Sequence, residues 1–266
     1  MEKIGKRFCI GDIHGAYIAF KQLLDDVNFD YENDKLICLG DIVDGWSETK
    51  ECLDLMMTIK NLVFVVGNHD EMALNYYHDT LDVVRNEYNV WIVNGGDTTL
   101  KSLGDRDTIE KKYLDFLDTS VYFHVEDENT DSQKLFVHGG VPLACCQEWD
   151  GKIVPLEDIH NHAFTWDRDM VKDAYVGRKN EKFKWGTKFE TIYVGHTPTI
   201  SFNEFYKKPQ NWGNICLMDT GSAFTGRLTI KDIDTGEEWD TKPCRQLYPD
   251  ESGRNRLSWN AEKRFG

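Results

Sequence analysis

Three polar clusters follow three apolar segments at nearly equal intervals, and this arrangement constrains the fold most. The segments RFCI, KLICLG and NLVFVV lead into GDIHG, GDIVDG and GNHD, so that Asp12, Asp41 and Asn68 are 29 and 27 residues apart. Between them, AYIAFKQLLDDVNF and SETKECLDLMMTIK have apolar residues at helical spacing. A strand, helix, strand repeat is typical of parallel βαβ units. We therefore expect the three clusters at one edge of a parallel sheet, where ligands of open α/β proteins bind.

The second half of the chain is richer in strand patterns. SVYFHVE, KLFVHGG, ETIYVGH, NICLMDTGS and RLTIKDI are short apolar or alternating runs with turn signals between them. Helical segments are expected around 71–89 and 108–118, with a turn at Gly95 and Gly96. The predicted fold is α/β: a two-sheet β-sandwich core flanked by helices, with βαβ units in the N-terminal half.

The length of 266 residues suits one large domain, which we place at residues 1–242. Residues 243–266 form a polar C-terminal tail that is expected to pack poorly. The polar, charge-mixed segment 167–188 is expected to be a helical cap or a mobile loop over the site.

The composition of the chain argues against nucleic acid and membranes as partners. With 46 acidic and 31 basic residues the formal charge is −15, which repels nucleic acid. No segment approaches the roughly 20 apolar residues that cross a bilayer, and the first ten residues do not resemble a signal peptide. The seven cysteines form no CxxC pair and indicate free thiols in a reducing cytosol, although the adjacent Cys145 and Cys146 could instead sense redox state. A cytoplasmic protein without nucleic-acid or membrane partners is expected.

Metal ligands recur where the predicted strands end. Each cluster alone is weak evidence, since a Gly-Asp after a strand is often a turn and a buried histidine is often a core residue. Together they place carboxylate, imidazole and amide groups at one sheet edge, a donor set that suits Mn, Fe, Zn or Mg. The residues are Asp12, His14, Asp41, Asn68, His69, His138 and His196.

GDIHG, GDIVDG, GNHD, HGG and GHT resemble the signature blocks of the calcineurin-like metallophosphoesterase superfamily. NGGDTTL, FTWDRD and MDTGSAF are similar to its phosphoprotein-phosphatase branch, which includes bacterial serine/threonine phosphatases and symmetrical dinucleoside tetraphosphatases. The resemblance implies two divalent cations, with manganese expected and iron, zinc or magnesium as alternatives. It implies that Asp12 and His14 hold the first, that Asp41 bridges both, and that Asn68, His138 and His196 hold the second. Two such cations lower the pKa of a shared water and clamp phosphoryl oxygens.

The resemblance also assigns roles beside the metals. His69 would protonate the leaving oxygen as a general acid, and Asp44 would pair with His69, although Asp44 could instead cap a turn. Arg168 and Asn68 would bind the phosphoryl group, although Arg168 could instead be a surface residue paired with Asp167 or Asp169.

Two arginines typical of the protein phosphatases are replaced here by Gly45 and Val66. Trp46, next to Gly45, could stack on a nucleobase or an aromatic leaving group, or could pack in the core. The predicted function is hydrolysis of a phosphomonoester of the serine/threonine phosphoprotein kind by a metal-bridging hydroxide. The alternatives are a dinucleoside polyphosphate hydrolase and a non-catalytic phosphate-binding scaffold. In either enzymatic case the partner is a phosphoprotein or a small phosphorylated molecule.

Overall fold

The computed structural model describes residues 5–82 and 84–255, and its first sheet contains the predicted βαβ units. Its strand order is β10-β9-β1-β2-β3. β1 (Arg7–Ile10), β2 (Lys35–Cys38) and β3 (Asn61–Phe64) are parallel, and the connections run through α1 (Tyr17–Asp26) and α2 (Thr49–Met56). β9 (Thr229–Asp232) pairs antiparallel with β1, and β10 (Glu238–Asp240) pairs antiparallel with β9.

The second sheet comes from the second half of the chain. Its order is β4-β5-β6-β8-β7. β5 (Lys134–Val137), β6 (Thr191–Val194) and β8 (Ile215–Leu217) are parallel. β4 (Phe123–Glu126) and β7 (Gln210–Trp212) close the two edges as antiparallel strands.

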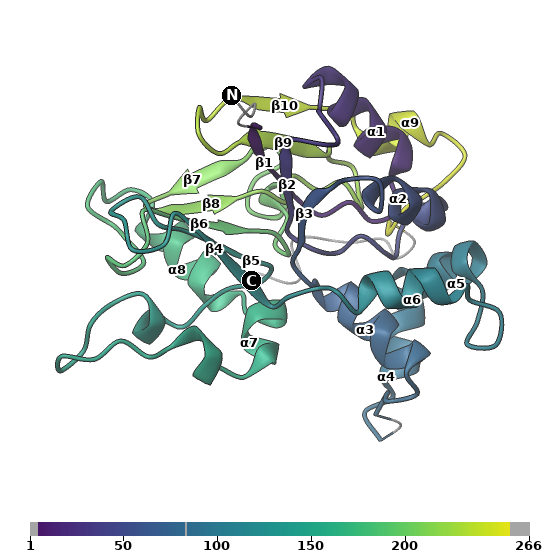
Figure 1. Ribbon diagram of the computed structural model, residues 1–266, viewed down its shortest axis with the longest axis horizontal. Coiled ribbons are helices and arrows are strands. Elements are labelled where there is room, and N and C mark those ends of the chain that lie inside the picture. Colours follow the sequence, from purple (N-terminus) through teal and green to yellow (C-terminus); the bar gives the residue numbers. More distant parts are fainter. Residues whose placement is uncertain (1–4, 83, 256–266) are drawn as a thin grey trace.

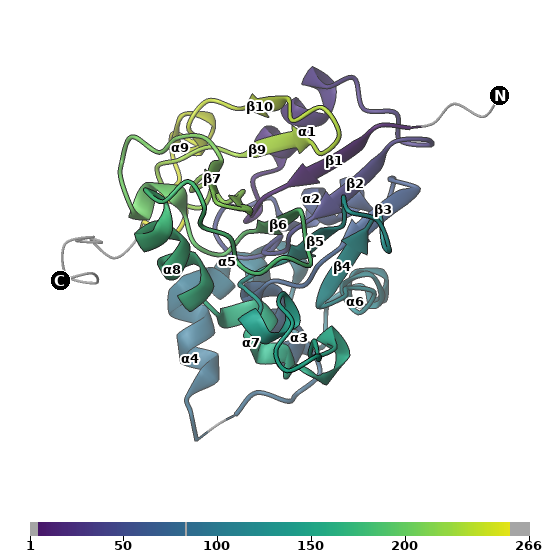
Figure 2. The ribbon, with the colours of Figure 1, turned by 90° about the vertical axis from the view of Figure 1, so that its left-hand side faces the viewer.

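The two sheets pack face to face, and alternation along each strand decides which side chains lie between them. Cys9 and Ile37 point inward and meet Phe136 and Tyr193, whose rings stack with centroids 4.8 Å apart. The side chains that alternate with Cys9 along β1 and with Ile37 along β2 point to the opposite face of the first sheet. α1 and α2 cover that face. α7 (Asn161–Trp166) and α8 (Asp169–Gly177) cover the second sheet (Figures 1 and 2). The predicted sandwich flanked by helices is confirmed.

The helical region between β3 and β4 differs from the prediction. α3 (Asn68–Tyr77) ends well before residue 89, and α4 (Glu87–Trp91) is a separate helix. The turn predicted at Gly95 and Gly96 is a kink between helices: Gly95 has a non-helical φ of 120° within the segment Ile92–Gly96, and α5 (Asp97–Leu103) follows directly. A Cβ on Gly96 would lie 2.5 Å from the Trp91 indole, so close packing requires glycine there. α6 (Lys111–Leu117) is where it was expected.

The remaining helical segments are short. They are the 3-10 turns Leu143–Cys145, Leu156–Asp158 and Thr199–Ser201, and α9 (Cys244–Leu247). Within the described residues, no helix combines the length and the apolar character needed to cross a membrane.

The C-terminal segment packs closely as far as the structure describes it. Cys244 and Tyr248 are buried, and the Tyr248 ring stacks on Trp46 with centroids 4.9 Å apart. The Tyr248 hydroxyl accepts a 2.9 Å hydrogen bond from the backbone N–H of Ile18. The prediction of a poorly packed tail is therefore wrong for residues 243–255, because these aromatic contacts outweigh the polar composition. Residues 256–266 lie outside the described part, and the domain boundary at 242 stays a prediction.

Ion pairs join the two sheets on the side away from the polar clusters. Glu126 of β4 accepts hydrogen bonds from Lys35 of β2 at 2.6 Å and from Arg7 of β1 at 3.1 Å. His124 contacts the same carboxylate at 2.6 Å. Burial opposes ionisation of Glu126, but the bonds from His124 and Lys35 outweigh it and lower the pKa of Glu126 to about 2.

Candidate active site

The sequence-predicted metal ligands meet at the carboxyl ends of five strands. Asp12 and His14 follow β1, Asp41 follows β2, Asn68 begins α3 after β3, and the remaining two histidines follow β5 and β6. All six side chains are buried. Two groups have ligand atoms within 4.8 Å of one another and share Asp41: Asp12, His14 and Asp41, and Asp41, His138 and His196.

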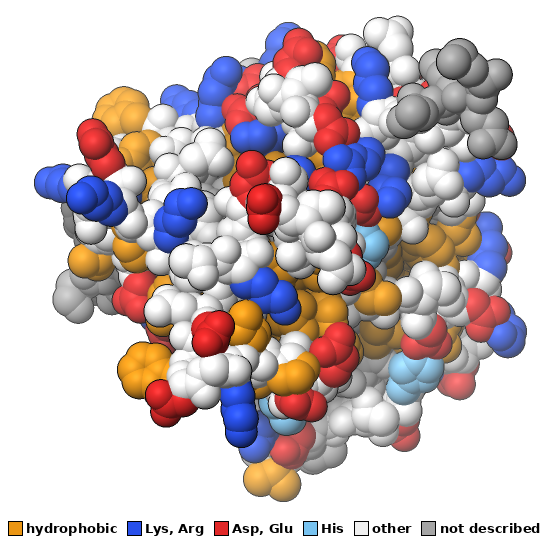
Figure 3. Space-filling view, turned by 60° about the vertical axis from the view of Figure 1, so that its left-hand side comes forward, with side chains coloured by type: hydrophobic (Ala, Val, Ile, Leu, Met, Phe, Trp, Pro, Cys, Tyr) orange, Lys and Arg blue, Asp and Glu red, His pale blue; other side chains and the backbone are white. Residues whose placement is uncertain are grey.

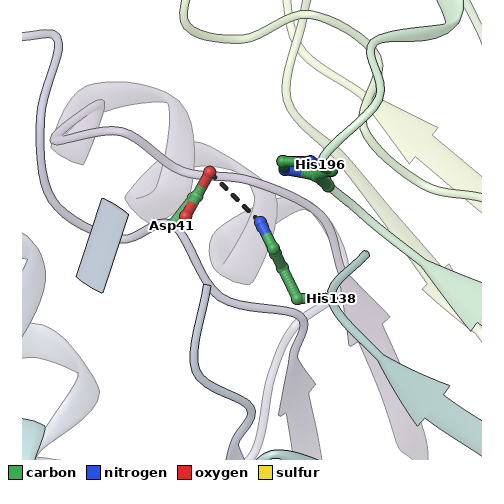
Figure 4. A group of neighbouring side chains, drawn as sticks. All are labelled: Asp41, His138 and His196. Atoms are coloured by element: carbon green, nitrogen blue, oxygen red, sulfur yellow. Dashed lines mark ion pairs between the residues drawn. The ribbon is translucent and has the colours of Figure 1, made fainter. Parts of the chain in front are cut away.

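The second group is the more compact. His138 Nε2 lies 3.3 Å from Asp41 Oδ2 and 3.1 Å from Asn68 Oδ1. Figure 4 shows the His138 ring directed at Asp41, with His196 beside both. The rings of His138 and His196 are 5.0 Å apart. Four predicted ligand side chains from four strand ends therefore lie close together.

The first group is more open. His14 Nε2 lies 3.6 Å from Asp41 Oδ2 and 3.9 Å from Asp12 Oδ2. The backbone N–H of His196 donates to both Asp12 oxygens, at 3.0 and 3.2 Å, which fixes that carboxylate beside the second group. The two groups are thus neighbours that meet at Asp41.

Hydrogen bonds from Nδ1 to backbone carbonyls orient the rings of His14 and His138. Nδ1 of His14 donates to the carbonyls of Val43 and Asp44, and Nδ1 of His138 donates to the carbonyl of Leu39 at 2.7 Å. In a neutral ring this directs the Nε2 electron pair at the carboxylates, the arrangement that metal-ligating histidines adopt. Burial opposes ionisation of His138, but the Asp41 carboxylate outweighs it and raises the pKa of His138 to about 9, so this ring has to give up a proton to bind a cation. Burial lowers the pKa of His14 to about 4, which keeps its ring neutral.

The donor set fits divalent cations. His196 Nε2 is buried and has no hydrogen-bond partner among the described residues. An orphaned buried acceptor costs free energy unless a ligand satisfies it. Asp12 and Asp41 are also packed together in the interior, and burial with the nearby Asp219 carboxylate raises the pKa of Asp12 well above its ordinary value. Cations between these groups would remove both costs.

The backbone at the site is strained. His14, Asp41, Asp44 and His196 have φ between 51° and 65°, a left-handed conformation that costs free energy for residues other than glycine. Such strain persists where surrounding structure enforces it, and it gathers at functional sites.

Asp70 enforces the conformation of the loop that carries Asp41. Its carboxylate accepts hydrogen bonds from the backbone N–H groups of Asp41, Ile42, Val43 and Gly67, at 2.6, 2.9, 3.3 and 2.9 Å. Asp70 is completely buried. The predicted ligand Asp41 is therefore positioned by a residue that the sequence pattern did not single out.

Asp44 contacts His69, as predicted for these two residues. His69 Nδ1 and Asp44 Oδ2 are 2.7 Å apart, which requires a proton between them. Asp44 also accepts from Trp91 Nε1 at 2.9 Å and from Thr99 Oγ1 at 2.6 Å, so its side chain does not cap a turn. Burial raises the pKa of Asp44 and lowers that of His69, and both shifts favour an uncharged pair that shares the proton.

A cavity of about 230 Å³ adjoins the ligand groups and is lined by Asp12 and His196. Arg168 lines it as well, and its Nη1 donates to the carbonyl of His196 at 3.0 Å and to Thr197 Oγ1 at 2.9 Å. Arg168 is exposed, but neither Asp167 nor Asp169 pairs with it among the described residues, so the ion pairs of the surface alternative are not formed. Segment 167–188 supplies Arg168 and α8, whose Lys172 also lines the cavity.

Besides Lys172, two charged residues of the cavity wall, Asp219 and Arg254, were not predicted from the sequence. Asp219 follows β8 in MDTGS, at the same sheet edge as the ligands. Arg254 comes from the C-terminal segment that was expected to pack poorly. The one sequence feature that could have pointed to Arg254 is that position 45 lacks the arginine typical of protein phosphatases, so that another arginine could take its place. The cavity thus combines three basic side chains, of Arg168, Lys172 and Arg254, with the carboxylates of Asp12 and Asp219. Basic and acidic side chains are also interspersed on the face drawn in Figure 3.

Two alternatives from the sequence are resolved by burial. Trp46 is completely buried and donates from Nε1 to the carbonyl of Ser222 at 2.9 Å, so it packs and offers no stacking surface to a ligand. All seven cysteines are buried and free. Burial raises the pKa of Cys146 to about 12 and also raises that of Cys145, which disfavours the reactive thiolate that a redox sensor needs.

Comparison with known proteins identifies relatives over most of the chain. A sequence profile of calcineurin-like phosphoesterases matches residues 6–220. Serine/threonine-protein phosphatase 2 of Salmonella typhimurium is 30% identical over 231 residues, which cover 84% of this chain and 91% of that protein. The symmetrical bis(5'-nucleosyl)-tetraphosphatase of Pseudomonas fluorescens is 25% identical over 289 residues and covers 91% of this chain and 96% of its own. Among solved structures, a candidate diadenosine tetraphosphatase has the same fold, with a TM-score of 0.61, 16% identity and coverage of 90% and 94%.

Proposed function

The chain belongs to the calcineurin-like phosphoesterase family and is a phosphoric ester hydrolase, and we propose that its substrate is a phosphomonoester of the serine/threonine phosphoprotein kind. The observation that carries the proposal is the pair of ligand groups that share Asp41 and adjoin a cavity lined by Arg168. A phosphomonoester has a terminal dianionic phosphoryl group, which a small cavity with basic side chains can hold.

We assign two divalent cations to the site, with manganese as the expected metal. Asp12, His14 and Asp41 would hold one, and Asp41, Asn68, His138 and His196 the other. When bound, such cations activate a water molecule and offset the negative charge of the phosphoryl group. The free Nε2 of His196 and the carbonyl-bonded Nδ1 atoms of His14 and His138 support this assignment.

The other residues would bind the substrate and move a proton. Arg168 would hold phosphoryl oxygens, while its bonds to His196 and Thr197 fix its position. Asn68, whose Oδ1 lies 3.1 Å from His138 Nε2, would also contact the phosphoryl group. His69 would donate a proton from Nε2 to the leaving oxygen, and Asp44 would keep the ring oriented through its 2.7 Å contact with Nδ1.

A second candidate is hydrolysis of dinucleoside polyphosphates. Gly45 and Val66 leave the site without two arginines that a phosphoprotein phosphatase would have, and a symmetrical tetraphosphatase is among the relatives. This candidate uses the same cations and proton donor and differs in the leaving group. A non-catalytic phosphate-binding scaffold is the remaining alternative.

A substrate panel tests these alternatives. The protein loaded with manganese is assayed with phosphopeptides, dinucleoside polyphosphates, mononucleotides and a generic aryl phosphate. Fastest cleavage of the phosphopeptides supports the proposal, and fastest cleavage of the dinucleoside polyphosphates replaces it with the second candidate. Binding of two manganese ions without turnover of any compound would support the non-catalytic phosphate-binding scaffold.

We expect the protein to act in the cytoplasm on phosphorylated partners, without nucleic acid or membrane as a partner. The seven free, buried cysteines and the net charge of −15 support this expectation.

A further inference from the structure

Arg254 reaches the candidate active site from a distant part of the sequence. Its backbone N–H donates to the carbonyl of Ala223 at 2.9 Å, which joins the segment to the connection between β8 and β9. Its guanidinium lies over the Phe224 ring, 5.2 Å from the centroid, and lines the cavity with Arg168 and Lys172.

Gly45 makes room for the Arg254 side chain. A Cβ built on Gly45 would lie 3.6 Å from Arg254 Cγ, so a longer side chain at position 45 would occupy the space that Arg254 fills. Gly45 also has φ of 137°, a conformation that favours glycine. The position next to Asp44 therefore has no side chain of its own, and the arginine of the C-terminal segment lies beside it.

The guanidinium of Arg254 has few partners within the described part of the chain. Among the described residues, no carboxylate lies within 4.0 Å of the Arg254 guanidinium, so it forms no ion pair there. Its Nη2 donates a long hydrogen bond of 3.3 Å to Asn94 Oδ1. Asp41, Asp44 and Asp219 attract it from a greater distance, while burial lowers its pKa. Most of its five N–H groups thus have no partner among the described residues and are available to an anion in the cavity.

We propose that Arg254 binds the phosphoryl group of the substrate as a second guanidinium, together with Arg168, in the cavity that Asp12 and His196 also line. The proposal deepens the proposed function and rests on it. Two guanidinium groups can contact up to four phosphoryl lone pairs, which favours a terminal phosphoryl dianion over the singly charged phosphate of a diester.

The alternative is that Arg254 only balances the charge of the buried aspartates. The two roles differ in what happens when the metal site is filled. Divalent cations already neutralise the aspartates, so a charge-balancing arginine would then be dispensable. An arginine that binds phosphate would be needed most in the loaded protein, because the phosphate lies between the cations and the guanidinium.

Binding of inorganic phosphate tests the proposal without requiring turnover. Isothermal titration is performed on the manganese-loaded wild type, Arg254→Ala, Arg254→Lys and the control Arg245→Ala, whose arginine is exposed on α9 of the same segment. We expect Arg254→Ala to bind phosphate at least about tenfold more weakly at unchanged manganese content, since charge-assisted hydrogen bonds are lost. Arg254→Lys should recover part of the affinity, because it keeps the charge but not the planar fork. Arg245→Ala should bind as the wild type does.

Two further readings make the result decisive. Millimolar guanidinium chloride should restore phosphate binding to Arg254→Ala by filling the vacated space. Wild-type phosphate affinity in Arg254→Ala, or parallel loss of manganese and phosphate in both Arg254 variants, would overturn the proposal. Failure of the wild type to hydrolyse any phosphomonoester would instead overturn the proposed function, and the phosphate titration would still report on Arg254.

Discussion

Replacing Asp70 with asparagine should destabilise the fold and the metal site together. The two carboxylate oxygens of Asp70 each accept two backbone N–H groups. In Asp70→Asn one oxygen becomes an NH₂ group that cannot accept, so two buried N–H donors lose their partner whichever way the amide turns. Each orphaned donor costs about 1–3 kcal/mol, and the free energy of unfolding should fall by about 2–6 kcal/mol.

A matched control exists at the opposite end of β2. Asp34 is also buried, but each of its oxygens accepts one backbone N–H, from Lys6 at 2.7 Å and from Asp30 at 2.9 Å. Asp34→Asn therefore orphans one donor and should cost about half as much as Asp70→Asn. Both variants are unfolded with urea in the presence of EDTA, at a pH well above 7, because burial raises the pKa of Asp70 to about 7.

The two variants should differ more in metal binding than in stability. Without the Asp70 carboxylate, Asp41 is free to leave its strained conformation at φ of 51°, so manganese titration should show weaker binding to Asp70→Asn and unchanged binding to Asp34→Asn. The reasoning is refuted if Asp70→Asn is no less stable than Asp34→Asn, or if it binds manganese as tightly as the wild type.

The other predictions concern the proton donor, the phosphate contact and the sheet-to-sheet ion pairs. His69→Asn should keep both metals and lower turnover most for aryl phosphates with poor leaving groups; an equal loss for good and poor leaving groups contradicts the general-acid role. Arg168→Ala should raise KM more than it lowers metal content, and unchanged kinetics would remove Arg168 from the site. Glu126→Gln should lower stability near neutral pH by up to about 3 kcal/mol, because the pKa of Glu126 falls from 4.5 to about 2 on folding. That contribution is fully present above pH 4.5 and is lost as the pH falls towards 2, so urea unfolding of variant and wild type should converge at low pH; a constant difference would contradict it.

Periodicity predicted the parallel part of the fold because each candidate ligand follows the end of a strand. The spacing of Asp12, Asp41 and Asn68 was enough to place them at one edge, since parallel βαβ units align their carboxyl ends. The strands β7 and β10 were not predicted, because QNW and EWD are three residues long and too polar to show a pattern. They form at sheet edges, where pairing with a longer neighbour decides the structure.

The residues around the ligands were harder to predict because their partners are distant in sequence. Trp91 and Thr99 hold Asp44 from a helical region in which the sequence predicted a turn, and Arg254 enters from a segment without a motif. Such contacts depend on which loops the fold brings together, and a local sequence pattern does not predict which loops these are.

The pairing of β1 with β9 has a consequence for synthesis of the protein. β1 lies in the middle of its sheet, between β2 and β9, yet Thr229–Asp232 leaves the ribosome long after Arg7–Ile10. Throughout translation of the intervening chain, one side of the nascent β1 has unpaired backbone groups next to the apolar side chains of Phe8 and Ile10. A chain that ended before residue 229 would lack β9 and β10 and would leave β1 as an open edge of the sheet, a site prone to aggregation.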